Sequence, residues 1–329
     1  MRSRTAVPIV GGALMVVVLT TALGRSQQPP GALAPGELRV TLLGTGNPRP
    51  SVERFGPSTL VEAGPRRILV DAGRGSSIRL FQLGAGPFVA RLDAVLLTHL
   101  HSDHVVGLPD LWLTGWIFGR AAPFVVYGPP GTAALMANLE RAYEFDIRMR
   151  RDVDERFPAA GIAAQATDVQ PGIVFDRDGL EVTAFMVEHG PVVPAYGYRI
   201  DYGGHSVAFS GDTRLSENVI EHARGVDVLV HEVLSPEVER RRAQVVDPAA
   251  IERIIERHTT PEQAGSLFAR VKPRLAVYSH IVPSPATPDD LIGPTRKTYS
   301  GPLEVGRDLM AITIGDRIDV RLVQPPPDR

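Results

Sequence analysis

Four side chains that can bind a metal fall within six consecutive positions, and this segment constrains the fold more than any other. It reads His99-Leu100-His101-Ser102-Asp103-His104 and follows the apolar run Ala94 to Leu97. Such a run is typical of a buried β-strand, and residues two apart on extended backbone share a face. Imidazole and carboxylate groups are the usual ligands of zinc and related divalent ions. The segment therefore predicts a metal site at the end of a buried strand.

Three more candidate ligands, His189, Asp212 and His280, each follow a predicted strand. A lone histidine at a strand end is more often a structural residue, so each signal is weak by itself. Strand ends at one edge of a sandwich converge in space, which makes the set much stronger than its members. The turn Gly44 to Pro48 follows another strand and is predicted to form a loop at the rim of the site.

Composition sets broad limits on the function. The chain has 329 residues, of which 43% are hydrophobic and 22% charged, enough for one large domain or two small ones. A formal net charge of −2 implies no strong basic field, which argues mildly against a dedicated nucleic-acid binder but leaves a local basic patch open. Because the chain has no cysteine, any metal site must use His, Asp or Glu.

The N-terminus has the pattern of a targeting segment. Arg2 and Arg4 precede an uncharged, largely apolar stretch from Thr5 to Gly24. We interpret residues 1–24 as a secretory signal, with an uncleaved membrane anchor as the alternative. Residues 25–36 then read as a proline-containing linker, 37–323 as the folded domain and 324–329 as a tail. The predicted location is therefore exported, either periplasmic or secreted.

The motif His-x-His-x-Asp-His after an apolar strand resembles the metallo-β-lactamase superfamily, and the resemblance extends roughly from Leu38 to Leu322. It implies an α/β fold, a four-layer αββα sandwich of two mixed β-sheets. It also implies two divalent metal ions between the sheets, with zinc as the favoured metal. A hydroxide bridging the two ions would be the nucleophile.

The resemblance also assigns the ligands. Asp103 is expected to orient the nucleophile as well as to ligate, and Asp212 to bridge the two ions. Each ion has three further ligands by this resemblance. One ion is bound by His99, His101 and His189, and the second by Asp103, His104 and His280.

Two further segments resemble the branch of ribonuclease Z and the arylsulfatases: His231-Glu232, and His258-Thr259-Thr260. By this resemblance His258 is the general acid that protonates the leaving oxygen, and Glu232 orients it. The sequence departs from the family at Val233-Leu234, where Ala-Thr is expected. The alternative for His258 is a structural histidine at a helix C-terminus, where the helix dipole favours it.

Within this branch the sequence favours a hydrolase of small phosphodiester or sulfate esters. The interval between His189 and Asp212 lacks the long arm with which ribonuclease Z grips tRNA, the net charge is slightly negative, and the N-terminus predicts export. Ribonuclease Z with tRNA 3′ processing is the alternative, followed by a lactonase or β-lactamase, and then by a metal-stabilised binding protein. Nucleic acid is thus left open but not favoured, membrane contact is expected only through an uncleaved N-terminus, and a homodimer is left open.

Two other features carry alternatives. Asp71 is predicted either to contact a ligand histidine or to cap a turn. Trp112 and Trp116 are predicted either to wall a substrate pocket or to pack in the core. Thr132 and Thr260 are predicted to be helix N-caps, and residues 148–156 a solvated connection.

Overall fold

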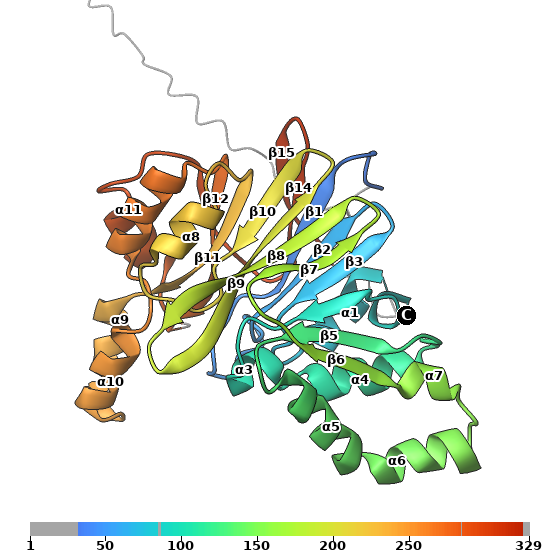
Figure 1. Ribbon diagram of the computed structural model, residues 1–329. Helices are drawn as coiled ribbons and strands as arrows, with labels where there is room; N and C mark the ends of the chain where they lie inside the picture. The colour runs from blue at the N-terminus through green and yellow to red at the C-terminus, as the bar shows by residue number, and fades with distance from the viewer. Residues whose placement is uncertain (1–31, 85–86, 284, 325–329) are drawn as a thin grey trace, which may run out of the picture.

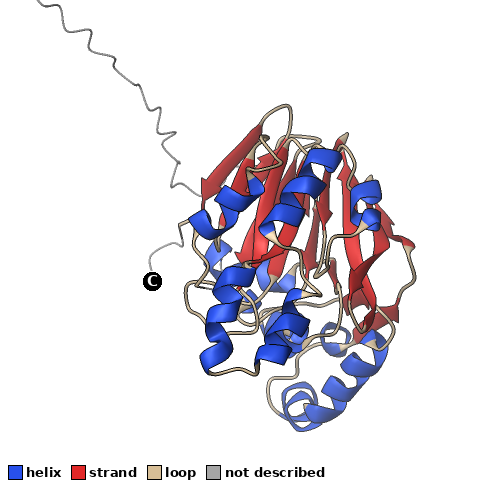
Figure 2. Ribbon diagram, turned by 90° about the vertical axis from the view of Figure 1, so that its left-hand side faces the viewer, coloured by secondary structure: helices blue, strands red, loops and turns tan. Residues whose placement is uncertain are grey.

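Two β-sheets stack face to face, and helices cover the outer face of each (Figures 1 and 2). This computed structural model describes residues 32–84, 87–283 and 285–324. The predicted four-layer αββα sandwich is confirmed. The predicted signal or anchor at 1–24 lies outside the described residues, so it stays a prediction. Within the described ranges, no helix is both long enough and apolar enough to cross a membrane.

The first sheet is mixed, antiparallel from β15 to β3 and parallel from β3 to β6. The parallel part matters for the site, because β4 runs directly into the histidine-rich segment. In spatial order the strands are β15 (Ile318–Leu322), β14 (Met310–Ile314), β1 (Leu38–Gly44), β2 (Ser58–Ala63), β3 (Arg66–Val70), β4 (Ala94–Leu96), β5 (Phe124–Gly128) and β6 (Ala164–Asp168).

The second sheet is also mixed, parallel from β13 to β10 and antiparallel from β10 to β7. Alternate side chains of both sheets point inward and form one apolar core between them. The spatial order is β13 (Leu303–Val305), β12 (Leu275–Val282), β11 (Val228–Leu234), β10 (His205–Phe209), β9 (Val192–Tyr202), β8 (Leu180–His189) and β7 (Gly172–Arg177).

The helices form the two outer layers, each over its own apolar cluster. Those that follow the first sheet's strands are α1 (Ser76–Gly84), α2 (Pro87–Ala90), α3 (Ser102–Val105), α4 (Leu108–Ile117), α5 (Thr132–Ala142), α6 (Glu144–Arg148) and α7 (Ala159–Ile162). Those of the second half are α8 (Glu217–His222), α9 (Pro236–Arg240), α10 (Pro248–Ile255), α11 (Pro261–Val271) and α12 (Pro288–Thr295).

Of the two predicted helix N-caps, one is confirmed and the other is wrong. Thr260 caps α11 as predicted: its hydroxyl accepts from the backbone N–H of Gln263, whose side chain accepts from Thr260 in return. Thr132 does not cap α5, because its hydroxyl donates to the Pro129 carbonyl instead. Gly131, at φ 106°, takes the N-cap position, a conformation that glycine adopts without strain.

The predicted solvated connection at 148–156 is wrong in part. α6 ends at Arg148, and a π-helical turn spans Met149–Val153. Arg150 stabilises this turn through ion pairs with Asp146 and Glu155. The charged side chains of this segment form ion pairs with one another along a helix. Composition alone does not distinguish such a helix from a solvated loop.

Both tryptophans pack in the core between α4 and its neighbours, so the pocket alternative is wrong. Trp112 and Trp116 are fully buried. Their indole N–H groups donate to the carbonyls of Ile162, at 2.8 Å, and Pro158, at 2.9 Å. A buried indole needs such a partner, and both partners here belong to the chain around α7.

Candidate metal centre

The structure brings all seven predicted ligands to one edge of the sandwich. They come from the loop after β4, from α3, from the ends of β8 and β10, and from β12. Asp103 and His104 lie in the first turn of α3, immediately after the loop that holds His99 and His101. His280 has φ 42° and lies where the β11–β12 register shifts, opposite Glu232. Such a bulge turns a strand side chain away from its regular direction, here toward the other ligands.

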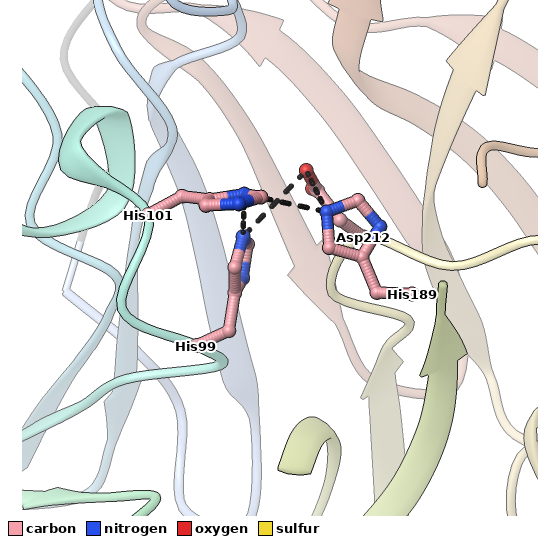
Figure 3. A group of neighbouring side chains, drawn as sticks. All are labelled: His99, His101, His189 and Asp212. Carbon is pink, nitrogen blue, oxygen red and sulfur yellow. Dashed lines mark hydrogen bonds and ion pairs between the residues drawn. The ribbon is translucent and has the colours of Figure 1, made fainter. Parts of the chain in front are cut away.

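One group comprises His99, His101, His189 and Asp212, whose candidate ligand atoms all lie within 4.8 Å of one another. Figure 3 shows the rings converging: His101 Nδ1 lies 2.9 Å from His99 Nε2 and 3.3 Å from His189 Nε2. Burial lowers the pKa of His99 well below its ordinary value and that of His189 to about 4. Neutral imidazole is the form that binds a metal ion.

A second group, Asp103, His104 and His280, adjoins the first. Asp212 faces both groups: its Oδ2 lies 3.4 Å from His280 Nε2 and 3.8 Å from His189 Nε2. His104 Nε2 and Asp212 Oδ1 are buried, 3.4 Å apart, and have no hydrogen-bond partner. Buried polar atoms without a partner are costly, and a cation between them would satisfy both. The residues therefore fit two metal ions sharing Asp212.

The charge distribution of the site centres on Asp212. Burial disfavours its charged form, but His280 and His104 outweigh burial and hold the pKa of the carboxyl well below its ordinary value. For His104, burial lowers the pKa, whereas Asp212 and Asp71 raise it well above 6.5. A buried carboxylate therefore stays ionised here only because positive charge lies beside it. Metal cations would supply that charge when they are bound.

Two contacts behind the ligands fix their ring orientations. Asp71 Oδ2 lies 2.8 Å from His104 Nδ1, while the Thr98 backbone N–H donates to Asp71 Oδ1 at 2.8 Å. The Arg257 carbonyl lies 3.2 Å from His189 Nδ1. Each partner favours the tautomer whose Nε2 lone pair faces the other ligands. The predicted contact between Asp71 and a ligand histidine is confirmed.

Glu232 and His258 also lie together, as the resemblance implies. His258 Nδ1 is 3.2 Å from Glu232 Oε2, and Glu232 Oε1 accepts backbone N–H groups from Thr259, at 2.8 Å, and Thr213, at 3.3 Å. Burial, together with the Asp212 carboxylate, raises the pKa of Glu232 well above its ordinary value, and burial lowers the pKa of His258 to about 4. Charge is thus disfavoured on both partners of this pair.

The atypical neighbours of Glu232 do not disturb it. Val233 and Leu234 are fully buried, and Val233 belongs to the apolar cluster under the helices of the second half. His231, which the sequence leaves without a role, is also fully buried, with Nδ1 2.6 Å from the Glu232 carbonyl. Its burial and this contact indicate a structural residue.

The ligands open onto a cleft of about 600 Å³. Asn47 and Pro48 lie at its rim, which confirms the predicted rim loop. Arg49 and Arg257 also line the cleft, although no motif in the sequence marks either residue. The available signals were their positions, next to the rim turn and directly before His258. The other lining residues include His101, Asp103, His189, Asp212, His258 and His280.

Two mixed sheets that hold such a ligand set at one edge define a metal-dependent hydrolase of the metallo-β-lactamase fold. The model of the "Beta-lactamase superfamily domain" matches residues 66–281. Ribonuclease Z of Mycobacterium bovis is 36% identical over 287 residues, covering 85% of this chain and 99% of the relative. Ribonuclease Z of Mycobacterium avium is 37% identical over 284 residues, covering 84% and 98%. The chain belongs to the metallo-β-lactamase superfamily, in its ribonuclease Z branch.

Solved structures share the fold. A metallo-β-lactamase fold protein from Bacillus subtilis superposes with a TM-score of 0.65 at 19% identity, covering 84% of this chain and all of that protein. The short form of human tRNase Z gives a TM-score of 0.61 at 21% identity, covering 84% and 99%. At these identities the structures support the architecture alone.

The predicted preference for small phosphodiester or sulfate esters is contradicted by the relatives, and so is the prediction of a small-molecule partner. The missing arm does not set this chain apart from these relatives. The alignment with the Mycobacterium bovis ribonuclease Z covers 99% of that protein within 287 residues, which leaves no room in it for a long segment that this chain lacks. The short interval between His189 and Asp212 therefore does not distinguish this chain from ribonuclease Z.

Proposed function

We propose that this protein is a ribonuclease Z-type endoribonuclease that cleaves precursor tRNA at its 3′ side, with two zinc ions as cofactor. The relatives that share 36–37% identity over nearly their whole length carry the name ribonuclease Z. The seven-residue ligand set supports a dinuclear centre. RNA is then the partner, and the positive charge it needs must be local because the whole chain carries a net charge of −2.

The observation that carries the proposal is the pair His258–Glu232 beside the ligands. When bound, the two ions supply a deprotonated water for attack on phosphorus and offset the charge on the phosphate. The ribose 3′ oxygen leaves poorly as an alkoxide and needs a proton. His258 lines the cleft, and its Nδ1 lies 3.2 Å from Glu232 Oε2. The remaining ring nitrogen is the donor to the leaving oxygen, and Asp103 orients the attacking water.

The bond changes predict the products. The water oxygen bonds to phosphorus as the bond from phosphorus to the ribose 3′ oxygen breaks. The tRNA body therefore ends in a 3′-hydroxyl, and the trailer begins with a 5′-phosphate.

The test uses the full chain, loaded with zinc, and a precursor tRNA transcript that carries a 3′ trailer. We expect one cut with those two end groups, and loss of cleavage in Asp212→Ala. Asp227→Asn is the control. Asp227 is also a buried carboxylate near a histidine, His205, but neither residue is a candidate metal ligand. An intact transcript with wild-type protein that has bound two zinc ions would overturn the proposal.

A further inference from the structure

Two arginines from separate segments of the chain line the cleft beside the candidate ligands. Arg49 lies in the loop after β1, and Arg257 follows α10. Within the part of the chain that the structure describes, neither guanidinium pairs with a carboxylate. Arg242, the third arginine on this wall, differs because it bonds at 2.6 Å to Glu239, whose side chain is fully buried. Two positive groups thus border the cleft with their hydrogen-bonding capacity unused.

Both backbones are fixed to the metal centre. The Arg49 N–H donates to Asn47 Oδ1 at 3.0 Å, and the Asn47 amide donates at 2.6 Å to the carbonyl of Ile281, the residue after His280. The Arg257 carbonyl lies 3.2 Å from His189 Nδ1. The backbone of Arg257 therefore contacts a ligand histidine, and that of Arg49 is linked through Asn47 to the residue after another.

The placement suits a polymer of phosphates. A substrate with a single phosphate needs only the metal centre. An RNA strand also brings a phosphate on each side of the scissile one. Guanidinium binds phosphate through paired N–H donors and stays charged at every working pH. Contacts of this kind set the position of a nucleic acid without reading its sequence.

We propose that Arg49 and Arg257 bind the phosphates that flank the scissile phosphodiester, and so make the cleft selective for an RNA strand. This inference rests on the proposed function, since it names the part of the RNA that this site holds. The two residues are binding residues, and no step of bond cleavage is assigned to them.

The test compares Arg49→Ala and Arg257→Ala with Arg253→Ala. Arg253 is an exposed arginine of α10 whose nearest carboxylate is 3.8 Å away, and it does not line the cleft. For each cleft variant we expect KM for precursor tRNA to rise roughly tenfold while kcat at saturation and zinc content stay unchanged. The slope of log Kd for RNA against log salt should fall by about 0.7 for each arginine removed. Arg→Lys at either position should restore the salt slope but only part of the affinity.

Cleft variants that match Arg253→Ala in KM and salt slope would overturn the inference. A loss of zinc would also overturn it, because the arginines would then support the centre rather than the RNA. If wild-type protein leaves the precursor intact, the proposed function fails. RNA binding by the full chain still tests the arginines in that case, through the same salt slopes.

Discussion

The contact between Asp71 and His104 gives the sharpest prediction about the metal centre. In Asp71→Asn, one amide position must still face the Thr98 backbone N–H, which donates at 2.8 Å and therefore requires the carbonyl oxygen. The amide NH₂ group then faces His104 Nδ1, 2.8 Å from the present carboxylate oxygen. Two N–H donors cannot share that contact. His104 must move its proton to Nε2, the nitrogen that faces Asp212, and it loses the lone pair that binds metal.

The expected cost follows from this change of tautomer. Loss of a partner behind a ligand histidine weakens metal binding about 10- to 100-fold, which corresponds to about 1.4–2.7 kcal/mol. Only the ion bound by Asp103, His104 and His280 should be affected. Titration with zinc in competition with a chromophoric chelator should therefore show one site of unchanged affinity and one weakened site.

Asp227→Asn is the matched control, because Asp227 also accepts a backbone N–H, from Ser206 at 2.8 Å, and lies 3.5 Å from His205. It should leave both zinc affinities unchanged whatever its effect on stability. Equal affinities in Asp71→Asn and wild type would refute the argument from tautomers. Equal weakening of both sites would show that Asp71 acts through the fold instead.

Three further predictions address the acid, the core and the N-terminus. His258→Ala should slow cleavage of precursor tRNA about 10²–10⁴-fold but slow a linkage with sulfur in place of the leaving 3′ oxygen much less; equal slowing of both would remove His258 from the acid role. Trp112→Ala should lower the free energy of unfolding by about 3–5 kcal/mol in urea titrations, and a change below about 1 kcal/mol would contradict its place in the core. Fractionation of cells that produce the chain with a C-terminal tag should find it in the membrane or exported fraction if residues 1–24 are a signal or anchor, and its recovery wholly from the soluble cytoplasm would contradict that interpretation. A wholly exported protein would not meet precursor tRNA in the cytoplasm, so that outcome would count against the proposed function.

The sequence predicted the part of the site that depends on strand ends. An apolar run followed by polar residues marks where a strand stops, and parallel strands stop at a common edge. That regularity placed His99, His189 and Asp212 together across more than a hundred positions. It also extended to His280, although a bulge rather than a strand end directs that side chain.

The rest depended on contacts that no local pattern encodes. Trp112 and Trp116 are near the ligands in sequence, but their indole groups donate to carbonyls of the chain at 158–162. The Arg257 carbonyl contacts the distant His189, and Arg49 bonds to Asn47, whose side chain donates to the carbonyl of the distant Ile281. The substrate could not be predicted from the short interval between His189 and Asp212, because relatives named ribonuclease Z align with this chain over nearly their whole length.

Anomalous diffraction from crystals of the full chain grown with zinc would locate the bound ions themselves. We expect two zinc ions per chain at one edge of the sandwich, with Asp212 in contact with both. One ion should be bound by His99, His101 and His189, and the other by Asp103, His104 and His280. A single ion, or zinc bound elsewhere with these seven side chains unligated, would contradict this arrangement.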